Sequence, residues 1–400
     1  MLRLTAQQVR GFRLRAHHLD RRYPMERLEE VAGACGLINS PPGTWETAAF
    51  LRLEGCTLDK LQQALYRDKT LLQAWSYRGV PLVFPTAEAG IFLAPLVAQP
   101  GEDPWIYTRG IAAALDHVGM TFEETLVLVR QAASWLGEHT VQSKEELDRV
   151  LAQRVADLLP PERRARWNDP SMYGSPDRQT VGGAAVSFLL RPCAFGGQVV
   201  FGQREGIYPT FTAPRRWLGR PLPDCPDGQR TLVRRFLGCY GPATRRELAD
   251  WLGSSPAQAA RLWGLVEEEL EPVEVEVEGR RRFALAAHRT DLLAGEEGDR
   301  VLLLGPHDPY LGLRDRDLIL PDRAQQRALW RTVGSPGAVL LGGRAVGLWW
   351  GKTQGGRLSL SVTLWEPLSP LQQSRLEEQG QAYAAFRDLT LKSWTVALEE

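Results

Sequence analysis

Arginine is the residue type by which this sequence could bind phosphates and nucleic-acid bases. The chain has 48 basic residues, of which five are Lys and the other 43 are Arg. A guanidinium group binds phosphates and base edges with two parallel hydrogen bonds, although a GC-rich genome produces the same bias. The formal net charge is zero, so binding to nucleic acid would depend on local clusters. Candidates beside predicted turns and helix starts are Arg78, Arg178, Gln179, Arg191, Arg204, Arg215, Arg216, Arg245 and Arg246.

Cysteine and histidine are the other residues with chemical potential. The cysteines are odd in number, widely spaced and without a Cys-x-x-Cys pair: Cys35, Cys56, Cys193, Cys225 and Cys239. This pattern favours a reducing compartment and predicts neither a disulfide framework nor a zinc site. The six His residues also lack metal-ligand spacing. We therefore expect no metal and no cofactor. No apolar run reaches the length of a membrane span, so we expect no membrane partner.

The elements that must position the arginines are clearest in residues 228–285. Three helices are predicted there in succession, the second opened by the capping box Thr244-Arg-Arg-Glu247 and the third by Ser255-Pro256. Val and Glu then alternate with a period of two, Gly279 turns the chain, and a second strand follows. This order is typical of a winged helix, a fold that reads DNA. A small helical module used only for packing gives the same pattern.

Helices followed by a β-hairpin are predicted three times along the chain. The last hundred residues differ, because they contain short strands separated by Gly-rich turns and end in a helix from Leu371 to Phe386. The repeat predicts an α+β fold of three tandem winged-helix units followed by a small β-barrel or curled sheet. The expected boundaries are 1–108, 109–222, 223–298 and 299–400.

Several short motifs occur in an order that resembles a known family. They are Gly197-Gln-Val-Val-Phe-Gly202, Trp217-Leu-Gly219, Tyr240-Gly-Pro-Ala-Thr244 with Trp251, His307-Asp-Pro-Tyr310 and Gly343-Arg-Ala-Val-Gly-Leu-Trp349. Together they resemble the winged-helix family of alkylpurine and crosslink-repair DNA glycosylases (AlkZ and YcaQ) over essentially the whole chain. The resemblance implies three winged helices and a β-barrel arranged around DNA. It also implies excision of damaged bases by cleavage of the N-glycosidic bond.

The resemblance places the catalytic group in a loop of the first winged helix that reads Gln-x-Gln or Gln-x-Asp after a Leu. Cleavage builds positive charge on the deoxyribose, so a carboxylate or amide must stabilise that charge and hold the attacking water. The matching segment here is Leu37-Ile-Asn-Ser40, in which both catalytic positions are replaced. The remaining catalytic candidates are Asn39, Ser40 and Glu46. The non-catalytic alternative is that Asn39 and Ser40 belong to a turn ahead of a helix and that Glu46 interacts favourably with the N-terminus of that helix.

Three other segments bear on substrate binding. The family's Arg-Gly-x-x-His segment appears as Arg78-Gly-Val-Pro-Leu82, so a histidine that could touch the substrate is missing. In the third hairpin, Glu274, Glu276 and Glu278 would repel phosphates, which favours the second unit as the principal DNA reader. The segment from His307 to Tyr310 could form part of a substrate pocket, although Asp-Pro also fits a turn and Tyr310 a barrel core.

Three functions are compatible with the sequence. The first is a DNA glycosylase for alkylated purines with an altered catalytic loop. The second is a non-catalytic DNA-binding or regulatory protein of the same fold, and the third is a purely structural protein. The first two share one partner, duplex DNA with alkylated or crosslinked bases, and we expect a monomer in the bacterial cytoplasm, associated with the nucleoid. The loop at 38–40 favours the second function, whereas the resemblance over the whole chain favours repair.

Overall fold

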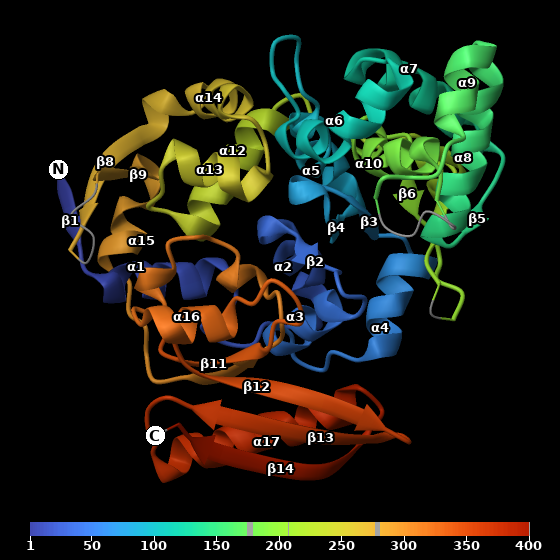
Figure 1. Cartoon of the computed structure of the whole chain (residues 1–400). Helices are drawn as coiled ribbons and strands as arrows, with labels where there is room; N and C mark the ends of the chain where they lie inside the picture. Colours follow the sequence, from blue (N-terminus) through green and yellow to red (C-terminus); the bar gives the residue numbers. More distant parts are fainter. Residues whose placement is uncertain (174–178, 207, 277–280, 400) are drawn as a thin grey trace. The chain divides into compact units, whose positions relative to one another are not determined.

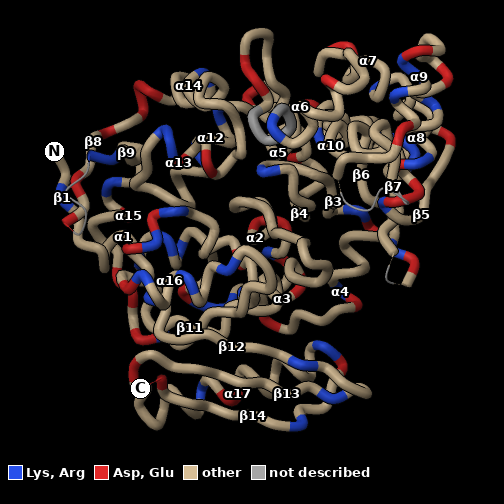
Figure 2. Tube along the Cα trace, in the orientation of Figure 1, with Lys and Arg blue, Asp and Glu red and all other residues tan. Residues whose placement is uncertain are grey.

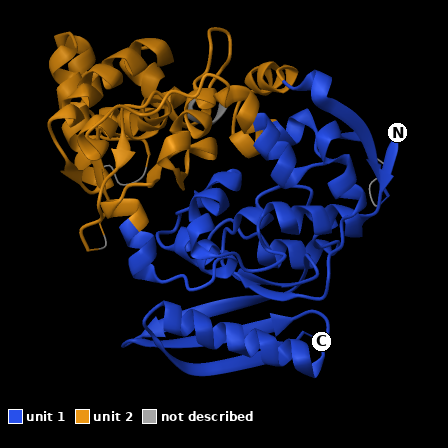
Figure 3. Cartoon of the chain, turned by 180° about the vertical axis from the view of Figure 1, so that it is seen from behind, with its two compact units in different colours: residues 1–63, 233–248, 266–400 blue, residues 64–232, 249–265 orange. Residues whose placement is uncertain are grey.

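The chain forms two compact units, each assembled from separate stretches of sequence (Figure 3). The structure is a computed structural model, and it describes residues 1–173, 179–206, 208–276 and 281–399 (Figure 1). Unit 1 comprises residues 1–63, 233–248 and 266–400, and unit 2 comprises residues 64–232 and 249–265. Among the described residues, no helix combines the length and the apolar character needed to cross a membrane.

Unit 1 begins with a succession of short helices and strands. Its first elements are β1 (Leu2–Leu4), α1 (Ala6–Ala16), α2 (Leu28–Cys35), β2 (Leu37–Ile38), α3 (Thr44–Arg52) and α4 (Leu58–Gln62). The Thr5 hydroxyl accepts a hydrogen bond from the Gln8 backbone N–H at 3.1 Å, and the Gln8 side chain accepts from the Thr5 N–H at 3.0 Å. This capping box fixes the start of α1.

The predicted third hairpin is present in unit 1. β8 (Leu270–Val275) pairs antiparallel with β9 (Arg281–Leu285) and parallel with β1. Along the chain the hairpin follows α12 (Gly228–Tyr240), α13 (Arg245–Leu252) and α14 (Pro256–Gly264), in the expected order. The Thr244 N–H donates to Glu247 Oε2 at 2.8 Å, and the Glu247 N–H donates to the Thr244 hydroxyl at 3.2 Å, so this capping box is confirmed. The hairpin turn, with Gly279, lies outside the described residues.

The C-terminal strands form an open five-stranded sheet. In order they are β10 (Val301–Leu304), β11 (Gly337–Leu341), β12 (Arg344–Gln354), β13 (Arg357–Leu364) and β14 (Thr390–Leu398). The predicted barrel is therefore corrected, because β10 and β14 are the two edges of the described sheet. The physical reason is the helix α17 (Pro370–Phe386), which crosses from β13 to a parallel β14 and packs against β10 and β14 (Figure 1). A helix over one face buries the apolar side chains without closure of the sheet.

Unit 2 is built around α10 (Val181–Phe195), which packs against α6 (Trp105–Val118), α7 (Phe122–Ala133) and α8 (Lys144–Leu158). Both predicted hairpins are present, as β3 (Leu71–Trp75) with β4 (Pro81–Pro85) and as the shorter β6 (Val200–Phe201) with β7 (Thr210–Thr212). The rings of Trp75 and Phe211 stack at 5.2 Å and join the two hairpins. Further elements are α5 (Ala89–Phe92), β5 (Val141–Gln142), α9 (Pro161–Trp167) and α11 (Pro214–Leu218).

Candidate active site

The candidate catalytic segment, Leu37–Ser40, includes β2 and leads into α3 in unit 1. The Ile38 side chain is buried and belongs to the core, whereas Ser40 is exposed. Asn39 is buried, and its Oδ1 accepts a hydrogen bond from the Gly43 N–H at 2.7 Å. The Thr44 hydroxyl donates to the Ile38 carbonyl at 2.6 Å. These bonds close the turn ahead of α3, and the Asn39 amide oxygen is used in that closure.

Glu46 lies in the first turn of α3 and is paired with a cation. Its side chain is 9% exposed and forms an ion pair with Arg387, the residue that follows α17. Arg387 also donates to the Gly43 carbonyl and to the Thr47 hydroxyl, both at 2.6 Å. The guanidinium group thus fixes the start of α3. It also cancels the charge of the one carboxylate in segment 37–46, which weakens any stabilisation of a developing cation there.

A second buried ion pair lies at the other end of α3. The Arg52 Nη1 and Nη2 atoms each donate to one Asp308 carboxylate oxygen at 2.8 Å. Burial by itself lowers the pKa of Arg52, but the Asp308 carboxylate more than offsets this and raises that pKa above its ordinary value. Asp308 Oδ1 also accepts from the Tyr310 N–H at 3.0 Å. Asp308 therefore anchors α3 and orders the turn before Tyr310.

Three of the motifs behind the family resemblance meet in the interior of unit 1. The Tyr240 hydroxyl donates to the Pro309 carbonyl at 2.7 Å, and the Tyr310 hydroxyl donates to the Gly343 carbonyl at 2.9 Å. The two tyrosines are 1% and 2% exposed, and burial raises the pKa of Tyr310. These contacts support the interpretation of Tyr310 as a core residue rather than part of a substrate pocket.

The candidate DNA-contacting residues fall into two groups. The exposed ones are Arg204, Arg215 and Arg216 in unit 2 and Arg245 and Arg246 at the start of α13 in unit 1. Arg78 and Arg191 are half-buried, and Arg191 Nε donates to the Gly79 carbonyl at 3.3 Å. Arg178 lies outside the described residues. Basic and acidic residues are interspersed along most of the trace (Figure 2), so the exposed arginines are local positive sites in a neutral chain.

Gln179 lines a pocket of unit 2 between α8 and the start of α10. The pocket has a volume of about 480 Å³ and is also lined by Lys144, Asp148 and Thr180. Lys144 and Asp148 form an ion pair. Burial lowers the pKa of Lys144 and raises the pKa of Asp148, because each charged form loses water contacts. The positive charge of Lys144 and the negative charge of Asp148 therefore neutralise each other in this pocket.

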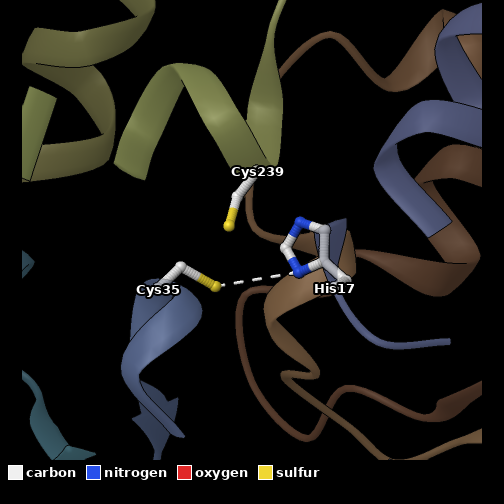
Figure 4. A group of neighbouring side chains, drawn as sticks. All are labelled: His17, Cys35 and Cys239. Carbon is white, nitrogen blue, oxygen red and sulfur yellow. Dashed lines mark hydrogen bonds between the residues drawn. The ribbon is translucent and has the colours of Figure 1, made fainter. Parts of the chain in front are cut away.

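Sequence reasoning missed two groups of residues in unit 1. Arg387 is 341 residues from Glu46, and nothing in either local sequence indicates that they pair. The side chains of His17, Cys35 and Cys239 lie together in the interior (Figure 4), although they lack the short spacings by which metal ligands are recognised in a sequence. Spacing rules detect only ligands that are close along the chain.

Comparison with known proteins assigns the family. A family model described as DNA glycosylase AlkZ-like matches residues 31–386. The chain is 26% identical over 359 residues to an interstrand DNA cross-link repair glycosylase from Streptomyces sahachiroi, a match that covers 87% of this chain and 88% of that protein. The solved structure of Streptomyces sahachiroi DNA glycosylase AlkZ has a similar α+β fold, with a TM-score of 0.76 at 23% identity over 99% of this chain and 100% of that one. The protein therefore belongs to the AlkZ-like DNA glycosylase family.

Proposed function

We propose that the protein binds duplex DNA carrying alkylated or crosslinked bases and that it cleaves their N-glycosidic bonds slowly. Family membership supports a substrate in damaged DNA, and the related Streptomyces protein is named for repair of interstrand crosslinks. The proposal that cleavage is slow rests on the ion pair between Glu46 and Arg387. It leaves the candidate catalytic loop without an uncompensated negative charge.

The chemistry of base excision explains why this pairing matters. Departure of the base builds positive charge on the deoxyribose, and an uncompensated carboxylate near the anomeric carbon lowers that barrier. Ile38 is apolar, Ser40 is neutral, and the charge of Glu46 is cancelled by Arg387. An N7- or N3-alkylated purine is already cationic and leaves more readily. We therefore propose cationic alkylpurines as the lesions on which residual excision is measurable.

A second candidate function is an active glycosylase in which Glu46 is the catalytic carboxylate. The observation that favours it is the accessibility of the pair, since Arg387 keeps 18% of its side-chain surface exposed. A DNA phosphate bound by Arg387 would draw the guanidinium group away from Glu46. The released carboxylate would then stabilise the cation or activate a water molecule.

The arrangement on DNA that we propose follows the repeated order of elements. The hairpins β3–β4, β6–β7 and β8–β9 each follow helices along the chain, which supports three winged helices at 1–108, 109–222 and 223–298 and a β-rich segment at 299–400. The exposed Arg204, Arg215 and Arg216 would contact backbone phosphates. We propose a monomer that acts on chromosomal DNA in the bacterial cytoplasm.

Excision on duplex DNA with a single N7-methylguanine separates the two candidates. Strand cleavage after alkali reports base loss under single-turnover conditions. The first candidate predicts a rate at least about a hundredfold below that of the Streptomyces glycosylase assayed beside it, unchanged by Glu46→Gln. The second predicts a rate that Glu46→Gln abolishes and that the exposed control Glu54→Gln preserves. Fast excision that survives both Asn39→Ala and Glu46→Gln would show that the catalytic group lies elsewhere.

A further inference from the structure

A cluster of three potential metal ligands lies in the interior of unit 1. His17 follows α1, Cys35 is the last residue of α2, and Cys239 lies near the end of α12. Their exposed fractions are 2%, 3% and 4%. One ligand atom from each residue lies within 4.8 Å of the other two, and Cys35 Sγ is 3.7 Å from His17 Nδ1. Three remote stretches of the chain therefore bring two sulfur atoms and one imidazole to a single buried point.

One distance in the cluster, a hydrogen bond between Cys35 and His17, is compatible with a tetrahedral zinc site. With Zn–S bonds of about 2.3 Å and a Zn–N bond of about 2.0 Å, a tetrahedron separates sulfur from nitrogen by roughly 3.5 Å and the two sulfurs by roughly 3.8 Å. The observed 3.7 Å between Cys35 Sγ and His17 Nδ1 is close to the first value. Thiolate and imidazole ligands also have the softness that Zn²⁺ accepts.

An independent observation concerns the imidazole of His17. Its Nε2 is buried and has no hydrogen-bond partner among the described residues, whereas buried polar groups are normally satisfied. Figure 4 shows the edge of the ring that carries both nitrogens turned toward the two sulfur atoms. The lone pairs of the two nitrogens diverge, so one ion binds only one of them: at Nδ1 it uses the 3.7 Å spacing to Cys35 Sγ, and at Nε2 it satisfies the unpartnered atom.

We propose that His17, Cys35 and Cys239 bind Zn²⁺. Binding releases the two thiol protons to solvent, and two thiolates with one Zn²⁺ carry no net charge, so the complex can remain buried without an uncompensated ion. The Tyr240 hydroxyl, 3.8 Å from Cys35 Sγ, offers a polar group for the fourth position.

The site would act as a structural clamp beneath the candidate catalytic loop. Cys35 ends α2, and β2 begins two residues later at Leu37. A metal ion held by Cys35, His17 and Cys239 would therefore tie the root of the loop to the ends of α1 and α12. Structural zinc sites contribute their binding free energy directly to folding. The clamp is independent of whether the loop cleaves N-glycosidic bonds.

Metal content and Zn²⁺ binding of the full chain test the proposal. The protein is stripped with a chelator under reducing conditions and titrated with Zn²⁺ alone against a chromogenic chelator. We expect about one Zn²⁺ per chain and, for Cys35→Ser or Cys239→Ser, binding at least about tenfold weaker. The control Cys56→Ser removes another buried cysteine of unit 1 and should leave binding unchanged. Co²⁺ substitution should add a thiolate charge-transfer band that Cys35→Ser removes.

A second measurement, the melting temperature of the unmodified chain with and without Zn²⁺, tests the proposal even if a variant does not fold. Zn²⁺ should raise its melting temperature and a chelator should reverse the rise, because a ligand that binds only the folded state stabilises it. Binding of no Zn²⁺ by the reduced chain, or equal binding by Cys35→Ser and the unmodified protein, would overturn the proposal. A Cys35–Cys239 disulfide that forms while the reduced chain binds no Zn²⁺ would instead identify the cluster as a redox pair.

Discussion

The two ends of α3 carry buried ion pairs that serve different purposes. At the C-terminal end, Arg52 pairs with Asp308, a residue of the segment His307–Tyr310 that contributed to the family resemblance. At the N-terminal end, Glu46 pairs with Arg387 beside a loop in which both expected catalytic residues are replaced. The Arg52 pair joins α3 to a segment behind the family resemblance, whereas the Glu46 pair neutralises the carboxylate beside the candidate catalytic loop.

The largest expected effect is on stability, from loss of the Arg52–Asp308 ion pair at the C-terminal end of α3. Asp308→Ala leaves the Arg52 guanidinium buried without its carboxylate partner, and we expect a loss of about 3 to 5 kcal/mol in the free energy of unfolding. Denaturant unfolding monitored by circular dichroism measures this loss. Asp299→Ala is the control, because it removes a carboxylate from an exposed pair with Arg375 and should cost less than about 1 kcal/mol. Equal losses would show that the Arg52 pair is not a scaffold element.

The next effect concerns the altered catalytic positions. The double substitution Ile38→Gln and Ser40→Asp restores the family pattern and should raise excision of N7-methylguanine by about a hundredfold, equivalent to about 3 kcal/mol in the barrier. Single-turnover rates measure the rise, and the dissociation constant for duplex DNA should change less than about twofold. The volume-matched control Ile38→Leu with Ser40→Thr should have no effect. Failure of the first pair to raise the rate would mean that the substrate pocket has also changed.

The ion pair itself is tested by Arg387→Met. This change leaves Glu46 largely buried with an uncompensated charge, and we expect a loss of about 2 kcal/mol in stability. The freed carboxylate should at the same time raise excision of cationic lesions roughly tenfold. The matched control is Arg375→Met, which removes an arginine from a 3.9 Å surface pair. Lower stability without any gain in excision would separate Glu46 from the chemistry.

The smallest expected effect concerns DNA binding by unit 2. Replacing the exposed Arg215 and Arg216 together with Ala should weaken duplex binding by about tenfold and lower the slope of log K against log salt by roughly 2, since each phosphate contact contributes about 0.9. Fluorescence anisotropy across a salt series measures both quantities. Arg191→Ala should alter the slope less, because Arg191 is bound to carbonyls within unit 2. The reverse order would place the DNA surface along α10.

Local features of the fold could be predicted because their determinants lie within a few residues of each other. The capping box of Thr244 and Glu247 and the hairpin of β3 and β4 are of this kind. α6 was not predicted, and its N-cap residue, Pro104, supplies no side-chain cap. β14 was missed because Lys392 is an extra residue in its pairing with β13. Such a bulge interrupts the alternation of period two by which a strand is recognised.

Sheet closure and the neighbours of the catalytic loop could not be predicted in this way. Whether β10 pairs with β14 depends on the path of the chain between β13 and β14, which no strand pattern specifies. The close approach of α17 to the sheet depends on Gly380, where a Cβ atom would lie 2.5 Å from the Trp394 ring. The partner of Glu46 follows α17 and is brought to the loop only by tertiary packing. The sequence identified Glu46 as a candidate but not its ion pair with Arg387.

The distance along the chain between Glu46 and Arg387 has a consequence for the nascent protein. The two residues are 341 positions apart, and at a synthesis rate of about 5 to 20 residues per second Arg387 is made roughly 17 to 70 s after Glu46. During translation the start of α3 therefore carries a carboxylate whose cation does not yet exist. The candidate catalytic loop reaches its final electrostatic state only after the C-terminal segment has left the ribosome, so a stalled chain and a finished chain would present different loops to DNA.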